Sequence, residues 1–409
     1  DWVGFRKMEN VTMQDNDVVI VDAVRSATAK RNGRLSGFHV TKLLGDVLVS
    51  LIDRNKLDPG SVDHVAGGCI AQVGMQANNV TRTSWLSAGL PTHVGASTTS
   101  TQCGSGQHAN TWAHALISSG MAEIVIVCGV ESMTHIPMAS QIPVDADGEP
   151  YLGERYTDEY KKLYDPTNQL EGAERIADKW ELTREELDRF GVRSQNLAAQ
   201  AWKEGRFEGQ IVPFDISGDG SEIHDRDEGL RETTFEGLSK LSTIAGANYF
   251  TEPAKYHTAG TASQLADAAS ALLVMSMGKA KELGLRPLAR VVSSCLVGSD
   301  PALMLTGPIP ATEKLLLDSG YTKDDIDIYE INEAFASVVL AWAKELEIEI
   351  DDRVNPNGGA IAIGHALGST GPLLITKTVH ELHRSGGRLG LVTMCCGGGL
   401  GTGTLIERI

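Results

Sequence analysis

The sequence predicts an α/β protein in which a mostly parallel sheet is covered by helices on both faces. Short, continuous apolar runs of strand length alternate with longer stretches whose apolar residues recur at helical spacing. Strands that are apolar on both faces are typical of sheets buried between two helical layers. The 44 glycines suit the many tight turns that such an alternation needs. At 409 residues, the chain is long enough for two or three domains.

The first alternation of strands and helices occupies residues 18–128. Residues 22–37 are polar and contain glycine, so they are expected to form a loop after the first strand. The helix after this loop is well supported, because its leucines and valine fall on one face. Strands are expected at 18–21, 64–70 and 124–128, and helices at 41–54, 78–88 and 109–119.

The middle of the chain, residues 134–262, breaks the pattern. It is rich in proline, glycine and charged residues and holds two amphipathic helices, at 171–179 and 184–204. Thr183 and Glu186 have the spacing of a capping box for the second helix. We therefore expect this region to leave the sheet and return to it as an insertion.

From residue 262 the alternation of strands and helices resumes, so the two ends of the chain have the same pattern. This similarity predicts an internal duplication around the irregular middle. Helices are expected at 268–283, 311–318, 334–346 and 370–384, and strands at 288–295, 326–331, 389–394 and 401–406.

Composition narrows the classes of function. A net charge of −17, with acidic residues spread along the chain, argues against nucleic-acid binding, and a phosphate-bearing ligand would need a local basic pocket. No apolar run reaches the length of a membrane span. The six cysteines fit neither a zinc pattern nor a disulfide framework, and Cys69, Cys128 and Cys295 lie in apolar runs typical of a core. With no secretory signal visible, we expect a reducing, cytoplasmic location.

Cys103 begins the most informative stretch, because Gly-Ser-Gly and then a helix follow it. Small residues leave room for a substrate to reach the sulfur. The N-terminal end of a helix favours a thiolate, which is the nucleophilic form of cysteine. A buried structural cysteine in a tight turn is the competing interpretation.

Three later stretches carry polar residues at strand ends, where open α/β sheets place their sites. Asn332 and Glu333 stand at a strand-to-helix junction, where they suit either a site or a helix cap. His365 lies in a glycine-rich loop, so a substrate could reach it and it could act as a base, although a lone histidine is more often a packing residue. Cys395 and Cys396 precede three glycines whose N–H groups could line an oxyanion site.

Taken together, these stretches closely resemble the thiolases, the acetyl-CoA acyltransferases, over residues 18–409. The resemblance rests on Cys-x-Ser-Gly, Asn-Glu-Ala-Phe-Ala, Gly-Gly-Ala-Ile-Ala-Ile-Gly-His and Cys-x-Gly-Gly-Gly, which occur here in the family's order. It implies two similar α/β halves in a five-layered α-β-α-β-α arrangement with an inserted loop domain. The implied divisions are 16–133 completed by 263–287 for the N-terminal half, 134–262 for the loop domain and 288–409 for the C-terminal half.

The resemblance also implies roles for individual residues. Cys103 matches the nucleophile that becomes acylated, His365 the residue that activates it, and Cys395 the second cysteine, which acts as acid and base. Asn332 matches the residue that holds a water in a first oxyanion hole shared with His365. The backbone N–H groups of Cys103 and Gly397 match the second hole. Cys396 falls at a variable position, so no role is assigned to it.

Further matches concern the substrate. Ser263 and Arg231 match residues that contact coenzyme A, and Gln169 falls in the segment over the acyl pocket. Acyl-CoA and coenzyme A are therefore the implied substrates. No metal, redox cofactor, nucleic acid or membrane is implied. The family forms dimers or tetramers, so a homo-oligomer is expected.

Two departures from the family pattern bear on specificity. Ala366 follows the histidine where the family often has proline, and the segment 168–174 replaces the usual Met-Gly segment over the acyl pocket. Together with 227–234 this resembles an actinobacterial subgroup that shortens steroid side chains, which implies a bulky acyl group and a degradative direction. A biosynthetic acetoacetyl-CoA thiolase, a ketoacyl synthase-like condensing enzyme and a non-catalytic lipid or CoA carrier with the same fold are the alternatives.

Overall fold

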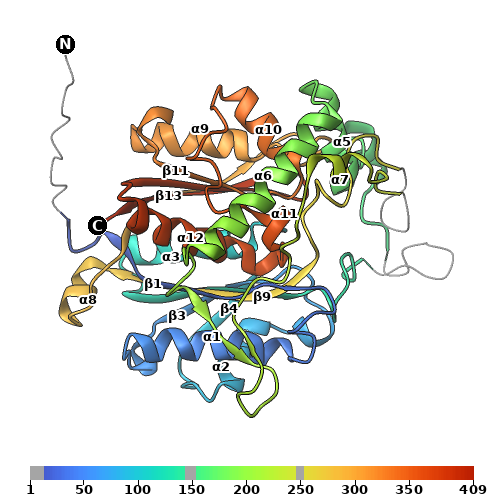
Figure 1. Cartoon of the computed structure of the whole chain (residues 1–409). Coiled ribbons are helices and arrows are strands. Elements are labelled where there is room, and N and C mark those ends of the chain that lie inside the picture. The colour runs from blue at the N-terminus through green and yellow to red at the C-terminus, as the bar shows by residue number, and fades with distance from the viewer. Residues whose placement is uncertain (1–12, 143–152, 246–252) are drawn as a thin grey trace.

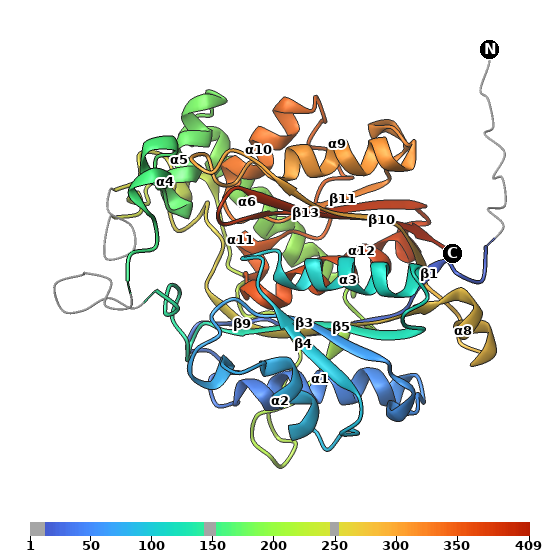
Figure 2. The ribbon, with the colours of Figure 1, turned by 180° about the vertical axis from the view of Figure 1, so that it is seen from behind.

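Three layers of helices alternate with two layers of strands (Figure 1). The computed structural model describes residues 13–142, 153–245 and 253–409. One outer layer holds α1 (Val40–Arg54) and α2 (Val80–Ser87), and α3 (Ser105–Ser118) and α12 (Leu367–Ser385) lie between the strand layers. The other outer layer holds α9 (Pro308–Ser319) and α10 (Ala336–Glu345), as the view from behind also shows (Figure 2). The five-layered arrangement is confirmed.

The N-terminal strand layer is mixed, so the prediction of a mostly parallel sheet is wrong. Its strands run in the order β1-β9-β5-β3-β4, with β3 parallel to both β4 and β5. Antiparallel β9 separates β1 from β5 and pairs with both. The strands are β1 (Val18–Ser26), β3 (His64–Gly68), β4 (Gly95–Thr99), β5 (Ile124–Ser132) and β9 (Ala266–Ser276), with the short β2 (Ala29–Lys30) beside β9.

The helix predicted at 268–283 is the main error in secondary structure. Residues 266–276 form β9, and the helix α8 (Met277–Glu282) occupies only the end of the range. Alanine and leucine favour helices, which misled the prediction. All but the last residue of β9 are buried, since α1 and α12 cover its two faces, and this burial outweighs intrinsic propensity.

The C-terminal strand layer repeats the scheme in the order β11-β12-β13-β10. Here β11 is parallel to β12, and β13 is antiparallel to both of its neighbours. Two residue pairs between β1 and β10 connect the two strand layers, so that they form one continuous hydrogen-bonded sheet. The strands are β10 (Ala289–Gly298), β11 (Ile328–Ile331), β12 (Leu389–Cys396) and β13 (Leu400–Arg408), and a short helix α11 (Ala360–Ile363) was not foreseen.

The inserted region supplies helices beside the C-terminal layers. The capping box of Thr183 and Glu186 is confirmed at the start of α6. Of the predicted loop domain, 143–152 and 246–252 lie outside the described residues. Its elements are α4 (Asp158–Leu163), α5 (Gln169–Lys179), α6 (Arg184–Lys203), α7 (Phe235–Ser239), β6 (Ile211–Val212), β7 (Phe214–Asp215) and β8 (Ile223–His224). Short 3-10 helices elsewhere are η1 (Pro59–Ser61), η2 (Gly74–Gln76) and η3 (Lys323–Asp325).

Two further expectations can be compared with this fold. Cys69, Cys128 and Cys295 are buried core residues, as predicted, and all six cysteines are free thiols. Within the described ranges, no helix combines the length and the apolar character needed to cross a membrane.

A buried ion pair ties the insertion to the N-terminal half. Arg25 at the end of β1 donates to both carboxylate oxygens of Asp227, at 2.8 and 3.0 Å, and both side chains are fully buried. Asp227 also accepts the backbone N–H of Thr28 and the indole N–H of Trp202. Removing one partner of such a pair leaves an uncompensated buried charge.

We therefore expect Arg25→Met to lower the free energy of unfolding by about 3–5 kcal/mol. The double variant Arg25→Met/Asp227→Asn is expected to recover part of that loss, because the neutral amide needs no counter-charge and can still accept from Thr28. Urea unfolding of the two variants measures the difference. A double variant no more stable than the single one would contradict this account.

Candidate active site

Cys103 lies in the short connection between β4 and α3, and α3 starts at Ser105, earlier than predicted. Gln102 adopts a left-handed backbone conformation with φ of 51°. The Ser105 hydroxyl holds this turn by donating to the Gln102 carbonyl and accepting the Thr101 N–H. A Cβ on Gly104 would lie 2.5 Å from the sulfur of Cys396, so glycine is required there. The sequence Cys-Gly-Ser thus forms a tight turn that presents one thiol.

Burial dominates the electrostatics of the Cys103 thiol. The side chain is 6% exposed, and burial raises its pKa to about 11. The backbone N–H groups of Gly397 and of Cys103 itself hydrogen-bond the sulfur and lower the pKa, while the Glu131 carboxylate raises it. The N–H groups favour the thiolate, as the sequence predicts, but they do not overcome burial. Cys103 is therefore a thiol at neutral pH.

His365 lies between α11 and α12 and is held at both ring nitrogens. Its Nδ1 is 2.7 Å from the Thr370 hydroxyl oxygen, and its Nε2 is 3.3 Å from the Asn332 side-chain nitrogen. Its backbone N–H donates to the Gln264 carbonyl. Burial lowers the pKa of the imidazole to about 4, so the ring is neutral at physiological pH. A neutral imidazole can accept a proton.

The two polar residues that follow β11, Asn332 and Glu333, make different contacts. Asn332 is buried, contacts His365, and its side-chain oxygen has no hydrogen-bond partner among the described residues. Glu333 instead accepts hydrogen bonds from the Ser194 hydroxyl, the Asn355 amide and the Ile361 N–H. It braces the loop that leads to His365, while Asn332 faces the histidine.

The larger of the two cavities at Cys103 has a volume of about 470 Å³. It is lined by Cys103 and His365 together with Ser263, Arg231 and Gln169. The structure thus brings these five predicted residues to one cavity. Two more cations, Lys30 and Arg31, also line it and were missed by the sequence analysis. The sequence offered only one indication of a binding role for them, which is that two cations stand side by side in an otherwise acidic chain.

A second cavity, of about 240 Å³, is also lined by Cys103. Gly397 and Gln169 contribute to its wall, so Gln169 borders both cavities. The Gln169 side-chain oxygen is buried and has no partner among the described residues. The rest of the wall is largely apolar and includes Ile70, Met133, Ile136, Met138, Ile142 and Met304.

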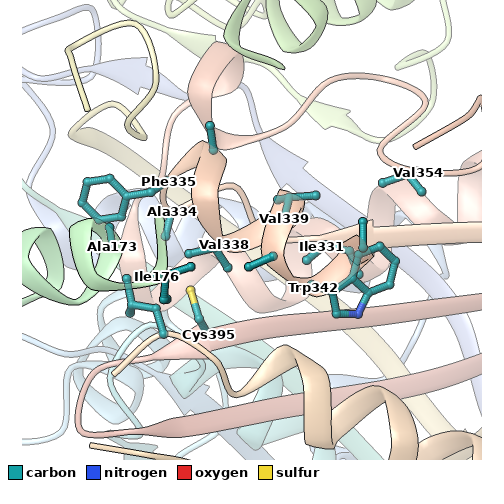
Figure 3. Packing of buried hydrophobic residues seen from close by; sticks show 14 of the residues in the cluster. Ala173, Ile176, Ile331, Ala334, Phe335, Val338, Val339, Trp342, Val354 and Cys395 are labelled. Atoms are coloured by element: carbon teal, nitrogen blue, oxygen red, sulfur yellow. The ribbon is translucent and has the colours of Figure 1, made fainter. Parts of the chain in front are cut away.

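Cys395 lies next to Cys103 but lines neither cavity among the described residues. It is fully buried in an apolar cluster that includes Ile176 of α5 and Val338 of α10 (Figure 3). Burial, and then the charge of Cys103, raise its pKa well above the usual value, so the two thiols are electrostatic neighbours. Burial raises the pKa of Cys396 too, and this thiol contacts the Gly104 N–H.

Glu131 also belongs to the site, although no role for it was predicted from the sequence. It is the last residue but one of β5, borders the smaller cavity and is buried, and burial raises its pKa. Its carboxylate accepts the backbone N–H groups of Ile70, Ala71 and Gly368, and also the Gln76 amide. It joins the loop after β3 to the start of α12, so it braces the wall around Cys103. No three His, Cys, Asp or Glu side chains of the described residues are grouped to hold a metal ion.

The two shifted pKa values at the site predict how Cys103 reacts with an alkylating agent. Because the thiol pKa is raised to about 11 and the imidazole is neutral above about pH 4, the thiolate fraction should rise continuously between pH 6 and pH 9. We expect the rate of alkylation by iodoacetamide to increase about tenfold for each pH unit, without a plateau. Stopped reactions analysed by peptide mass spectrometry measure this rate. A plateau at or below pH 7 would show a resting thiolate–imidazolium pair and would contradict the assignment.

Cys103 and His365 line one cavity to which both α/β halves contribute, and a thiol with an imidazole is the pair of groups that a cysteine-dependent acyltransferase needs. The family models for the thiolase N-terminal domain and the thiolase C-terminal domain match residues 18–278 and 285–408. The chain belongs to the thiolase family.

Relatives with assigned names agree with this membership. A steroid 3-ketoacyl-CoA thiolase of Mycobacterium tuberculosis is 42% identical, over 96% of this chain and 94% of its own. An acetyl-CoA acetyltransferase of Syntrophomonas wolfei is 39% identical, over 96% and 99%. The crystal structure of an acetyl-CoA acetyltransferase of Bacillus anthracis superposes with a TM-score of 0.85 at 36% identity, covering 96% and 99% of the two chains. This chain is therefore an enzyme of the acetyl-CoA acyltransferase class.

Proposed function

We propose that this chain cleaves 3-oxoacyl-CoA thioesters by thiolysis, with Cys103 as nucleophile and His365 as its base. The observation that carries the proposal is one cavity lined by a protonated thiol and a neutral imidazole. His365 takes the Cys103 proton as the sulfur attacks the keto carbon. The carbon–carbon bond then breaks, which leaves an acyl group on Cys103 and releases the enolate of acetyl-CoA.

Cys395 completes the proton transfers in this proposal. Its thiol donates a proton to the enolate carbon, and the resulting thiolate takes a proton from coenzyme A. The coenzyme A thiolate attacks the acyl-cysteine and forms the shortened acyl-CoA. The Cys103 thiolate that leaves takes its proton back from His365, which restores the resting enzyme. The apolar surroundings of Cys395 support this role, because burial holds the proton on the sulfur until a strong base forms beside it.

Two sets of hydrogen-bond donors suit the developing oxyanions. The backbone N–H groups of Cys103 and Gly397 already contact the Cys103 sulfur, where an oxyanion on the attacked carbon would form. On the His365 side, we assign Asn332 to hold a water that, together with the imidazole, binds the oxyanion of the leaving enolate. The unpartnered side-chain oxygen of Asn332 supports this, since a buried amide oxygen needs a donor.

Coenzyme A is assigned to the larger cavity. Ser263 suits the pantetheine, and Arg231 with Lys30 and Arg31 suits the phosphates. Three cations at one cavity supply the local basic site that a chain with a net charge of −17 needs. No metal or redox cofactor takes part in this chemistry.

The smaller cavity supports a bulky acyl group and a degradative direction. A volume of about 240 Å³ at Cys103 is far more than the methyl group of an acetoacetyl chain requires, and the wall is largely apolar. The relative named as a steroid thiolase supports steroid side-chain shortening as the particular activity. Gln169 borders the point where the acyl and pantetheine cavities meet, which suits a residue that orients the thioester.

A comparison of two substrates tests this specificity. We expect kcat/KM for a steroid 3-oxoacyl-CoA to exceed that for acetoacetyl-CoA by about tenfold or more, since additional apolar surface is buried with the larger chain. Initial rates of coenzyme A-dependent thiolysis measure both values. A strong preference for acetoacetyl-CoA would favour the biosynthetic alternative.

The remaining assignments concern the whole protein. We propose a homodimer or homotetramer, because β4 is an edge strand and Trp112 on the neighbouring α3 is 53% exposed. A monomer in sedimentation equilibrium would contradict this.

We propose a cytoplasmic location, since the mechanism needs reduced thiols. The divisions at 16–133 with 263–287, 134–262 and 288–409 are proposed as domains.

A further inference from the structure

The partners of the His365 ring determine which nitrogen carries its proton. Thr370 lies in the first turn of α12, and its hydroxyl oxygen is 3.1 Å from the Ala366 carbonyl oxygen as well as 2.7 Å from His365 Nδ1. A carbonyl only accepts, so the hydroxyl hydrogen points to Ala366. The Thr370 oxygen is then free to accept the hydrogen on Nδ1.

The contact at the other ring nitrogen requires the same arrangement. The Asn332 side-chain nitrogen, 3.3 Å from Nε2, is a donor only, so Nε2 must present its lone pair. His365, Thr370 and Asn332 are each no more than 3% exposed, so water does not replace either contact at a surface. Both contacts therefore select the tautomer with its proton on Nδ1.

We propose that Thr370 is a positioning residue that fixes His365 as the Nδ1–H tautomer and so keeps Nε2 unprotonated and able to take a proton. The proposal rests on the proposed function, in which His365 takes the proton from Cys103. Without the Thr370 oxygen, the buried Nδ1–H would have no acceptor, and the ring would gain by rotating or by moving its proton to Nε2. Either change removes the base from the reaction.

Nδ1 of His365 faces a hydroxyl, that of Thr370, and not a carboxylate, and this difference affects the pKa of the imidazole. A carboxylate beside Nδ1 would stabilise the imidazolium and raise the imidazole pKa. His365 shares its cavity with the Cys103 thiol and with the cations Lys30, Arg31 and Arg231, and the Glu131 carboxylate of β5 acts on Cys103. Within the described chain no carboxylate hydrogen-bonds the ring. The imidazole therefore takes the proton only while Cys103 attacks, and it gives the proton up readily afterwards.

Three substitutions at Thr370 test the proposal. Thr370→Val keeps the volume and removes the acceptor, so we expect kcat to fall by about 10²-fold or more with KM for coenzyme A unchanged. Thr370→Ser keeps the hydroxyl and is expected to retain kcat within about threefold. Thr370→Asp adds a charge beside Nδ1, so alkylation of Cys103 by iodoacetamide should become faster below pH 7 than in the unsubstituted enzyme.

Nitrogen-15 NMR of histidine-labelled enzyme reads the tautomer without any turnover. Protonation at Nδ1 in the unsubstituted protein, changed in Thr370→Val and restored in Thr370→Ser, supports the proposal. A Thr370→Val variant that keeps both the tautomer and kcat would overturn it. If Thr370→Val does not fold, an Nε2–H tautomer in the unsubstituted protein overturns the proposal, and so does unchanged alkylation in Thr370→Asp. Absence of thiolysis in the unsubstituted enzyme would instead refute the proposed function, because neither the tautomer nor the alkylation rate depends on turnover.

Discussion

Replacement of Cys103 by alanine should reduce kcat/KM for thiolysis by at least about 10⁴-fold. The loss should be this large because no covalent intermediate can form without the sulfur. Among the described lining residues, Cys103 is the one cysteine of both cavities, so no other thiol is placed to substitute for it. Absorbance assays of 3-oxoacyl-CoA consumption measure the loss.

The matched control for this experiment is Cys128→Ala. Cys128 is a fully buried thiol of β5 that lines neither cavity, so its removal tests the loss of a core thiol without loss of the nucleophile. We expect Cys128→Ala to lower thermal stability but to keep kcat/KM within about threefold. A Cys103→Ala enzyme with substantial activity would show that the nucleophile lies elsewhere.

Replacement of Cys395 by alanine is expected to stop carbon–carbon cleavage but to leave acylation of Cys103 intact. Cleavage generates an enolate that needs a proton, and we expect thiolysis to fall by about 10²–10⁴-fold when the donor is removed. Acyl transfer from a simple acyl-CoA to Cys103 forms no carbanion, so His365 suffices for it. Mass spectrometry of the protein after mixing with acetyl-CoA, beside the thiolysis assay, separates the two steps.

Cys396→Ala is the control for the second cysteine. Cys396 is equally buried and adjacent in sequence, and like Cys395 it lines neither cavity among the described residues, but its sulfur lies against Gly104. We expect this variant to retain thiolysis within about threefold, because no proton transfer is assigned to it. Equal loss in the two variants would indicate that the Cys395 effect is structural and would contradict its role as acid.

Much of the fold could be predicted because most strands are apolar on both faces. Strands β1, β5 and β12 are buried throughout, and their apolar runs were evident. The misassigned strand β9 is equally buried, but its alanines and leucines also suit a helix, and only the tertiary structure decides between the two. Strand β4 was missed because Gly95–Thr99 is made of small and polar residues at a sheet edge.

Some residues of the candidate site could be predicted from the sequence and others could not. Cys103, Asn332 and His365 could be found because each lies in a local pattern at the end of a strand or in a glycine-rich loop. The contacts made by Thr370, Lys30 and Arg31 have no such pattern, since they depend on how distant segments pack. The sequence also gave no indication that burial would outweigh the helix end at Cys103, because burial is a property of the folded chain.

The central claim is that Cys103 carries the acyl group during turnover. The most direct measurement is peptide mass spectrometry of the enzyme quenched after mixing with an acyl-CoA. We expect the mass of the acyl group on the peptide that contains Cys103, and unmodified peptides for Cys395 and Cys396. An unmodified Cys103, or an acyl group on another residue, would contradict the mechanism and would favour a carrier that binds acyl-CoA without reacting.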